Sequence, residues 1–230
     1  AVLTAVYDIR AAPIDMHLSA KAKSEAKRLA LLLALFLVLS GSYSLVTPLF
    51  EAPDEYAHLQ FISWLAQGNS LPNIETDLAK VSHEIGQPPL YYGLLAPLAA
   101  QTDLSDLGSI APLNQNLRSG AGINVHFHTE AEQFPYTGTA LAVRLIRLFS
   151  VVLGAITVAA TYGLARLFSP QIAFTAAMLV AFNPQFLFMS GVINNDNLVT
   201  ALSALTLLLL LKLMTNPAPS AWHYLLLGGV

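Results

Sequence analysis

The sequence predicts an all-α fold, a polytopic bundle of transmembrane helices with a large first outer loop that contains interfacial helices. Three observations lead to this prediction. Apolar residues make up 55% of the chain and charged residues only 11%, whereas a soluble domain carries about 25% charged residues. Mean hydropathy is +0.57. The charged residues are bunched between long apolar runs, the pattern expected when lipid is the solvent.

The composition also excludes several classes of function. A net charge of -3, without a basic patch interleaved with aromatic residues, argues against a nucleic-acid partner. The chain contains no cysteine. Disulfide bonds, thiolate chemistry and cysteine-type zinc sites are therefore excluded.

The first membrane helix is predicted at residues 29–49. This run carries no charge and is long enough to cross a hydrocarbon core of about 30 Å at about 1.5 Å per residue. Residues 1–28 before it are polar and end in a basic cluster, which predicts a cytoplasmic N-terminus. The basic residues are Lys21, Lys23, Lys27 and Arg28. A signal peptide is the alternative, but its apolar core is usually only about 7–15 residues long.

The large polar insert, residues 50–136, then lies on the outer side as a loop. Interfacial helices are predicted near 54–67, after Pro53, and near 88–100, after a proline pair. The second is too short to span, so we expect it in the interface, with its two tyrosines at headgroup level. Residues 101–136 are rich in Asn, Gly and Ser and are interpreted as loop.

Three further spans and the start of another follow this insert. The spans are predicted at 139–168, at 171–193 with a bend near Asn183–Pro184, and at 198–214. A helix that begins at 222–230 is cut short at Val230, so we expect the chain to be the first part of a longer protein. In this topology Arg166 and Lys212 lie inside, as the positive-inside rule predicts.

The stretch Glu51-Ala-Pro-Asp54-Glu55-Tyr-Ala-His58 directly follows the first membrane helix and is the first candidate site. Desolvation at an apolar boundary raises the pKa of a carboxylic acid, which suits Asp54 or Glu55 as a general base. Paired carboxylates can equally hold a divalent cation, although the metal ligands are left open. The alternative is that these acids only begin a helix.

Two more polar stretches fall on the same side of the membrane. His83 and Glu84 precede the Pro-Pro-Leu-Tyr-Tyr segment that contains Tyr91, and we expect them to face Asp54 across an outer cavity. The segment Asn194-Asn-Asp196-Asn can orient a phosphate or a metal, or cap the next helix. For both stretches the alternative is a solvated loop or turn. A third stretch, Asn124-Val-His-Phe-His128, is interpreted as an interfacial loop rather than a metal site.

Two arginines complete the candidate site. Arg144 and Arg147 lie near the outer end of the second span, where they can pair with a lipid phosphate. Ordinary anchoring to phospholipid headgroups is the alternative. The candidate substrate-binding residues are His58, His83, Glu84, Tyr91, Arg144, Arg147 and Asp196, and the candidate catalytic residues are Asp54 and Glu55.

The order of these motifs resembles a known family. Pro53-Asp54-Glu55 follows the first helix, then come Gln67-Gly-Asn69 and Gln87-Pro-Pro-Leu-Tyr-Tyr92, then Arg144-Leu-Ile-Arg147-Leu-Phe-Ser150, Tyr162-Gly-Leu-Ala-Arg166-Leu-Phe168, Asn183-Pro184 and Asn195-Asp196. The chain is similar, over about residues 29–214, to the N-terminal half of GT-C type integral membrane glycosyltransferases, the superfamily of protein mannosyltransferases and aminoarabinose transferases.

The resemblance implies a function. Such enzymes move a sugar from a polyprenyl-phosphate carrier to an acceptor outside the cytoplasm, without direct use of a nucleotide sugar. It implies Asp54 as the base or acceptor-positioning acid, Glu55 as its neighbour, Glu84 near a second acidic position, and a divalent metal ion as a cofactor of some relatives. It implies a multi-pass protein of the bacterial inner membrane, with a lipid-linked sugar donor, membrane lipids and other membrane subunits as partners. A non-catalytic scaffold subunit and a transporter are the alternatives.

Overall fold

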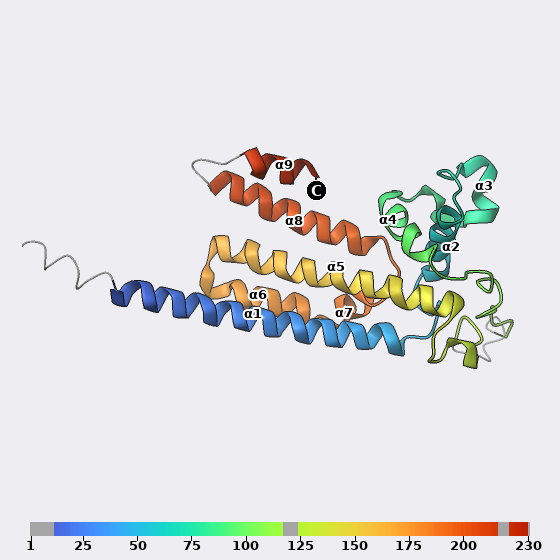
Figure 1. The fold of residues 1–230 in the computed structure, drawn as a ribbon, viewed down its shortest axis with the longest axis horizontal. Coiled ribbons are helices and arrows are strands. Elements are labelled where there is room, and N and C mark those ends of the chain that lie inside the picture. Colours follow the sequence, from blue (N-terminus) through green and yellow to red (C-terminus); the bar gives the residue numbers. More distant parts are fainter. Residues whose placement is uncertain (1–11, 117–123, 216–220, 230) are drawn as a thin grey trace, which may run out of the picture.

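The protein is an all-α membrane helix bundle (Figure 1). The computed structural model describes residues 12–116, 124–215 and 221–229. Along these residues the elements are α1 (Ala12–Val46), α2 (Glu55–Ala66), α3 (Ile74–Val81), the 3-10 helix η1 (His83–Gly86), α4 (Leu90–Ala99), the 3-10 helix η3 (Glu130–Glu132), α5 (Gly138–Phe168), α6 (Pro170–Ala181), α7 (Pro184–Ser190), α8 (Asp196–Thr215) and α9 (Ala221–Gly229). In the described part of the chain, the β-type pairing is a single antiparallel bridge between Leu113 and His126.

Three helices are long and apolar enough to cross a membrane, or four if the bent pair α6–α7 counts as one span. The first is the part of α1 from Ala22 to Val46, and the others are α5 and α8. The helix α1 begins before the predicted residue 29 and ends before the predicted residue 49, because Pro48 cannot continue the backbone hydrogen bonding. Residues 1–11 and 216–220 lie outside the described residues.

The helix α5 lies at the centre of the bundle and packs against α1, α6, α7 and α8. Gly154 permits the closest of these approaches. A Cβ atom at this position would lie 2.5 Å from Ser190 Oγ and 2.7 Å from the ring of Phe36. Small residues let membrane helices approach each other closely, so we expect a larger side chain here to separate α1, α5 and α7.

The bend between α6 and α7 measures 65° and lies at the predicted Asn183–Pro184 position. Pro184 occupies the first turn of α7, where a missing backbone N–H is tolerated. The Asn183 side-chain oxygen accepts hydrogen bonds from the backbone N–H groups of Gln185 and Phe186. The broken helix is therefore capped by its own sequence.

Residues 50–136, which we call the loop segment, lie at the end of the bundle where α1 ends and α5 begins (Figure 1). They share one apolar core with the bundle, in which Phe61 and Tyr92 stack at 4.1 Å and Ile146 of α5 is also buried. Asp106 accepts from the backbone N–H and hydroxyl of Thr139 at 3.0 and 2.6 Å, which caps α5 from the loop segment. The loop segment is therefore fixed to the bundle.

The expectation that Tyr91 and Tyr92 lie at headgroup level is wrong. Both are buried, at 1% and 0% exposure, while Leu90 and Leu94 on the opposite face of α4 are exposed. The reason is the packing of α4 on α2 and α5, which takes the aromatic face inward. The short helix α3, within residues that the sequence left as loop, is a further difference.

Candidate functional site

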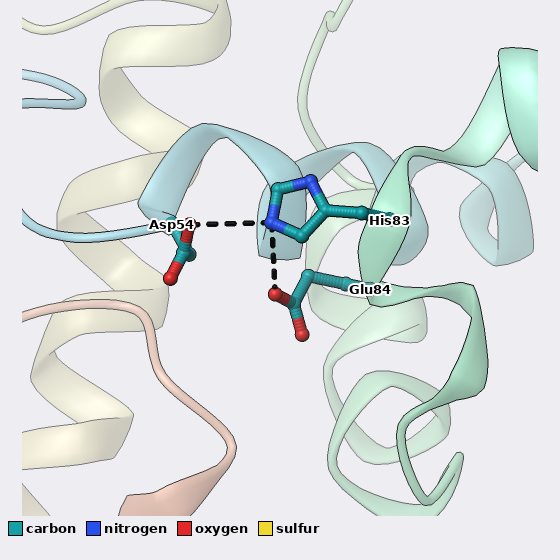
Figure 2. Close-up of side chains that lie close together, drawn as sticks. All are labelled: Asp54, His83 and Glu84. Carbon is teal, nitrogen blue, oxygen red and sulfur yellow. Dashed lines mark hydrogen bonds and ion pairs between the residues drawn. The ribbon is translucent and has the colours of Figure 1, made fainter.

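Asp54, His83 and Glu84 lie together beside the start of α2 (Figure 2). The Nε2 atom of His83 is 3.2 Å from Asp54 Oδ1 and 3.2 Å from Glu84 Oε1. The sequence predicted that His83 and Glu84 face Asp54 across a cavity, whereas in the structure His83 contacts both Asp54 and Glu84 directly. His83 and Asp54 keep 67% and 57% of their side-chain surface exposed, whereas Glu84 is buried.

The backbone turns the Asp54 carboxylate away from helix capping. Asp54 occupies the N-cap position of α2 with a φ of 57°, in the left-handed region, and its side chain makes no capping hydrogen bond. Its carboxylate points to His83 instead, and Figure 2 shows the second oxygen directed away from that ring. Asp54 is thus placed at a helix N-terminus, where negative charge is favoured, with one oxygen not engaged by His83.

The backbone conformation of Ser82 orients His83 and Glu84. Its φ of 86° and ψ of 179° are a backbone conformation that non-glycine residues rarely adopt and that costs roughly 1–3 kcal/mol. The Ser82 hydroxyl donates to the Ala57 carbonyl of α2 at 3.2 Å, which holds the strained turn against that helix. His83 and Glu84, the next two residues, are therefore presented to Asp54 from a fixed turn.

Behind the exposed pair, Glu84 has an oxygen without a hydrogen bond. Its Oε2 atom is buried, has no hydrogen-bond partner and lies 3.7 Å from Nδ1 of His58. That Nδ1 atom is 2.9 Å from the Tyr92 hydroxyl. Burial lowers the pKa of His58 more than the nearby carboxylates raise it, and burial raises the pKa of Tyr92. His58 is therefore neutral and Tyr92 keeps its proton, so that one hydrogen bond joins the two residues, and Glu84 Oε2 has no hydrogen-bond partner.

The donor set fits a divalent cation. One ligand atom each from Asp54, His83 and Glu84 lies within 4.8 Å of the others. Imidazole nitrogen and carboxylate oxygen together suit a divalent ion such as Zn²⁺ or Mn²⁺, and three protein ligands leave a position open for a substrate. The fit rests on the chemistry of this donor set: Glu84 presents Oε1 to His83 at 3.2 Å, whereas its buried Oε2 faces His58 on the other side.

An open pocket of about 470 Å³ adjoins this group. The residues that line it include Asp54, His83, Phe50, Tyr56 and His126. The pocket therefore brings a carboxylate and imidazole rings together with aromatic rings. This combination can hold a hydroxyl or amine group next to a base.

Glu55, the residue after Asp54, lies in a different environment. It is completely buried and pairs bidentately with Arg147 of α5, at 2.7 Å (Nε to Oε1) and 2.6 Å (Nη2 to Oε2). Its oxygens also accept the backbone N–H groups of Phe50 and Ile193, both at 3.0 Å. Glu55 therefore joins α2, α5 and the segment between α7 and α8.

All five N–H groups of Arg147 are used inside the protein. Besides Glu55, it donates to three carbonyl oxygens at the end of α1, those of Ser44, Thr47 and Pro48, at 2.8, 2.7 and 3.0 Å. These carbonyls at a helix end lack partners within the helix, and Arg147 supplies them. No donor of Arg147 remains for the lipid phosphate that the sequence suggested.

The remaining predicted residues lie outside the Asp54 group. Arg144 is buried over the Tyr136 ring, donates to the Ser44 carbonyl, and its Nε has no hydrogen-bond partner. The Tyr91 hydroxyl is 3.0 Å from Ser150 Oγ of α5 in the core. Asp196 begins α8 and is exposed; the neighbouring Asn195 donates to Gln87 before α4 at 3.2 Å.

The sequence reasoning did not identify a second cluster of titratable residues, formed by Glu51, His128 and Glu132. The two-histidine motif at 126 and 128 was the available signal. The carboxylate partners of His128 are Glu51, 77 residues before it, and Glu132, 4 residues after it. Glu51 comes close to His128 only when the chain folds.

Comparison with known protein families gives a match to the second part of the chain. The model of the dolichyl-phosphate-mannose-protein mannosyltransferase family matches residues 139–230, which include α5 to α9. This match supports a GT-C type membrane glycosyltransferase, and it lies outside the residues that hold Asp54, His83 and Glu84. No curated protein and no solved structure matches the chain.

Proposed function

We propose that this chain is the N-terminal part of a membrane glycosyltransferase that moves a sugar from a polyprenyl-phosphate carrier to an acceptor on the outer side of the membrane. One observation carries the proposal: an exposed carboxylate, Asp54, stands with His83 and Glu84 beside an open pocket at one end of an apolar helix bundle. The family match over α5 to α9 is the independent support for sugar transfer.

In the proposed reaction Asp54 takes the proton from an acceptor hydroxyl or amine in the pocket. The acceptor atom forms a bond to the anomeric carbon of the sugar, and the bond from that carbon to the phosphate oxygen breaks. The electron pair leaves with the polyprenyl phosphate. Because the phosphate is already a good leaving group, the protein needs mainly a base and correct positioning.

A divalent cation would be held by Asp54, His83 and Glu84 and would supply positive charge beside the departing phosphate. His58 stands behind Glu84, with Nδ1 3.7 Å from Oε2, and Tyr92 is hydrogen-bonded to His58. Because all donors of Arg147 are used within the protein, Arg144 is the member of this pair that is left to contact a lipid phosphate. Glu55 has the role of holding the Asp54 turn on the bundle, and Asp196, exposed at the start of α8, contacts substrate.

The proposed setting is the bacterial inner membrane, with the N-terminus in the cytoplasm and the loop segment outside. The basic cluster before the first span supports this orientation, together with Arg166 and Lys212 at the opposite end from the loop segment. Membrane lipids and a lipid-linked donor are then the first partners, and further membrane subunits are a second class.

The Asp54→Asn substitution tests the proposed base. We expect transfer to fall by about 10²- to 10⁴-fold, the usual contribution of a general base, while the protein still folds. Membranes containing the whole protein would be incubated with synthetic polyprenyl-phosphate sugars, polyprenyl-phosphate mannose first, and free polyprenyl phosphate would be measured by mass spectrometry. The matched control is Glu75→Gln, an exposed acid of α3.

Three results would count against this proposal. Full donor cleavage by Asp54→Asn would remove the role of Asp54. Equal losses in Asp54→Asn and Glu75→Gln would mean that loss of charge, and not the base, is responsible. No cleavage of any donor by the wild type, with the purified protein found only together with other subunits and without polyprenyl phosphate in native mass spectrometry, would favour a scaffold subunit.

A further inference from the structure

His128 is held between two carboxylates, one of which, Glu51, lines the pocket. Its Nδ1 is 2.8 Å from Glu132 Oε1 and its Nε2 is 3.0 Å from Glu51 Oε1. Ionised carboxylates accept hydrogen bonds and cannot donate them, and a neutral imidazole has only one N–H group. Both contacts are hydrogen bonds only when the ring carries two protons.

The surroundings of His128 favour this charge. Burial would lower the pKa of His128, but its hydrogen bonds and charge interactions with Glu132 and Glu51 outweigh burial and raise the pKa. The other titratable groups nearby are His126, whose charge would oppose that of His128, and Arg144 of α5, which lies near Glu132. Neither His126 nor Arg144 takes the place of Glu51 or Glu132 as the hydrogen-bond acceptor of His128.

The same two carboxylates tie the chain segment at 124–132 to the end of α1. Glu51 accepts the backbone N–H groups of Val125 and His126 at 3.0 and 2.9 Å. Glu132 accepts the backbone N–H of Leu49 at 3.2 Å. His128 bonds to both Glu51 and Glu132. Its charge therefore holds together two loop segments that are far apart in the sequence.

This arrangement holds part of the lining of the Asp54 pocket in place. Glu51, Val125 and His126 line the pocket, and the His126 ring packs edge-on against Phe50 at 5.7 Å. The Nδ1 atom of His126 is buried. The ring therefore gives the pocket its shape, and this nitrogen is not accessible to a substrate.

We propose that His128 is a positioning residue of the pocket: in its charged form it clamps Glu51 and Glu132 and so fixes Val125 and His126 in the lining of the pocket that receives the acceptor. This inference rests on the proposed function for the role of the acceptor, whereas the clamp itself does not. The clamp is complete below about pH 6.5, the ordinary pKa of histidine, and loosens as the pH rises through the raised pKa of His128. Glu51 stays ionised throughout, because its backbone and His128 hydrogen bonds together outweigh burial and lower its pKa.

Hydrogen exchange at the amides of Val125 and His126 tests the clamp without any activity assay. In the wild type we expect their protection factors to fall by about tenfold between pH 5.5 and pH 8.5, because one charge-assisted hydrogen bond is lost. In His128→Gln protection should be low at every pH, and in His128→Lys, which stays charged, it should be high at every pH. Amides of α3 serve as the internal reference. Wild-type protection that does not change with pH would overturn the clamp, even if the variants fail to fold.

Kinetics of transfer then test the positioning role. His128→Gln should raise the KM for the acceptor several-fold, with a smaller change in kcat, and His128→Lys should restore it and abolish its pH dependence. An acceptor KM that is the same in both variants would overturn this role. Exchange that follows the pH in a protein without transfer activity would overturn the proposed function and leave His128 as a structural clamp only.

Discussion

Two clusters of charge lie side by side in this molecule and differ in every physical respect. Glu55 and Arg147 are completely buried, and every donor of the guanidinium is bonded within the protein. Asp54 and His83 are more than half exposed, and Glu84 behind them has an oxygen without a partner. Adjacent acids of one motif therefore perform opposite tasks. Glu55, whose oxygens are all hydrogen-bonded within the protein, stabilises the fold. Asp54, which is exposed, remains accessible to a substrate.

The largest predicted effect is on stability, from removal of one half of the buried pair. Arg147→Ala leaves the Glu55 charge buried and the carbonyls of Thr47 and Pro48 without donors, whereas the Ser44 carbonyl still accepts from Arg144. We expect a loss of about 3–5 kcal/mol in the free energy of unfolding, measured by thermal unfolding in detergent. The control is Arg166→Ala at the opposite end of α5, whose ion pair with Glu25 is exposed, with an expected cost of about 0–1 kcal/mol. Similar losses in both variants would contradict the contrast between the two clusters.

The second prediction concerns the open cluster. If Asp54, His83 and Glu84 bind a divalent cation, an excess of about 100 times the Kd stabilises the fold by about 2.7 kcal/mol. Thermal unfolding with added Zn²⁺ or Mn²⁺, and again with EDTA, measures this difference. Glu84→Gln should remove the shift and Glu75→Gln should keep it. A shift of equal size in both variants would mean that the ion binds elsewhere.

The third prediction concerns the stability of a variant at Asp54, in comparison with the buried pair of Glu55 and Arg147. Asp54→Asn removes a charge that is exposed and makes no capping bond, so stability should change by less than about 0.5 kcal/mol. This unfolding measurement accompanies the transfer assay for the same variant. A stability loss close to that of Arg147→Ala would show that Asp54 belongs with the structural charges and not with the open cluster.

The last prediction concerns the pH dependence of stability and comes from His58. Its pKa is lowered in the fold, mainly by burial, so the unfolded chain binds the proton more readily. Its contribution to stability is complete above about pH 6.5 and is lost as the pH falls through the lowered pKa, with a slope of at most about 1.4 kcal/mol for each pH interval of one. Urea unfolding of wild type and His58→Gln between about pH 7.5 and pH 5 measures the difference. Parallel pH profiles for the two proteins would contradict a neutral His58.

Features that depend on local sequence were predictable. Long uncharged runs identify membrane spans, because only a helix satisfies its own backbone hydrogen bonds in lipid. The pair Asn183–Pro184 identifies the bend, since proline removes a donor and asparagine caps the next helix. Within the candidate site, the expectation that His83 and Glu84 face Asp54 came from their placement on one side of the membrane, and the structure has His83 at 3.2 Å from Asp54.

The sequence by itself therefore determined the all-helical membrane bundle, the bend in its third span and the identity of the acids near the pocket. Tertiary structure alone decided which of those acids is buried. Arg147 follows Glu55 by 92 residues, and no periodicity connects two charges across such a distance. The same holds for the inward side of Tyr91 and Tyr92 and for the contact between His128 and Glu51. The physical reason is that periodicity reports on neighbours along a helix, whereas the partner of a charge is set by how helices and loops pack in space.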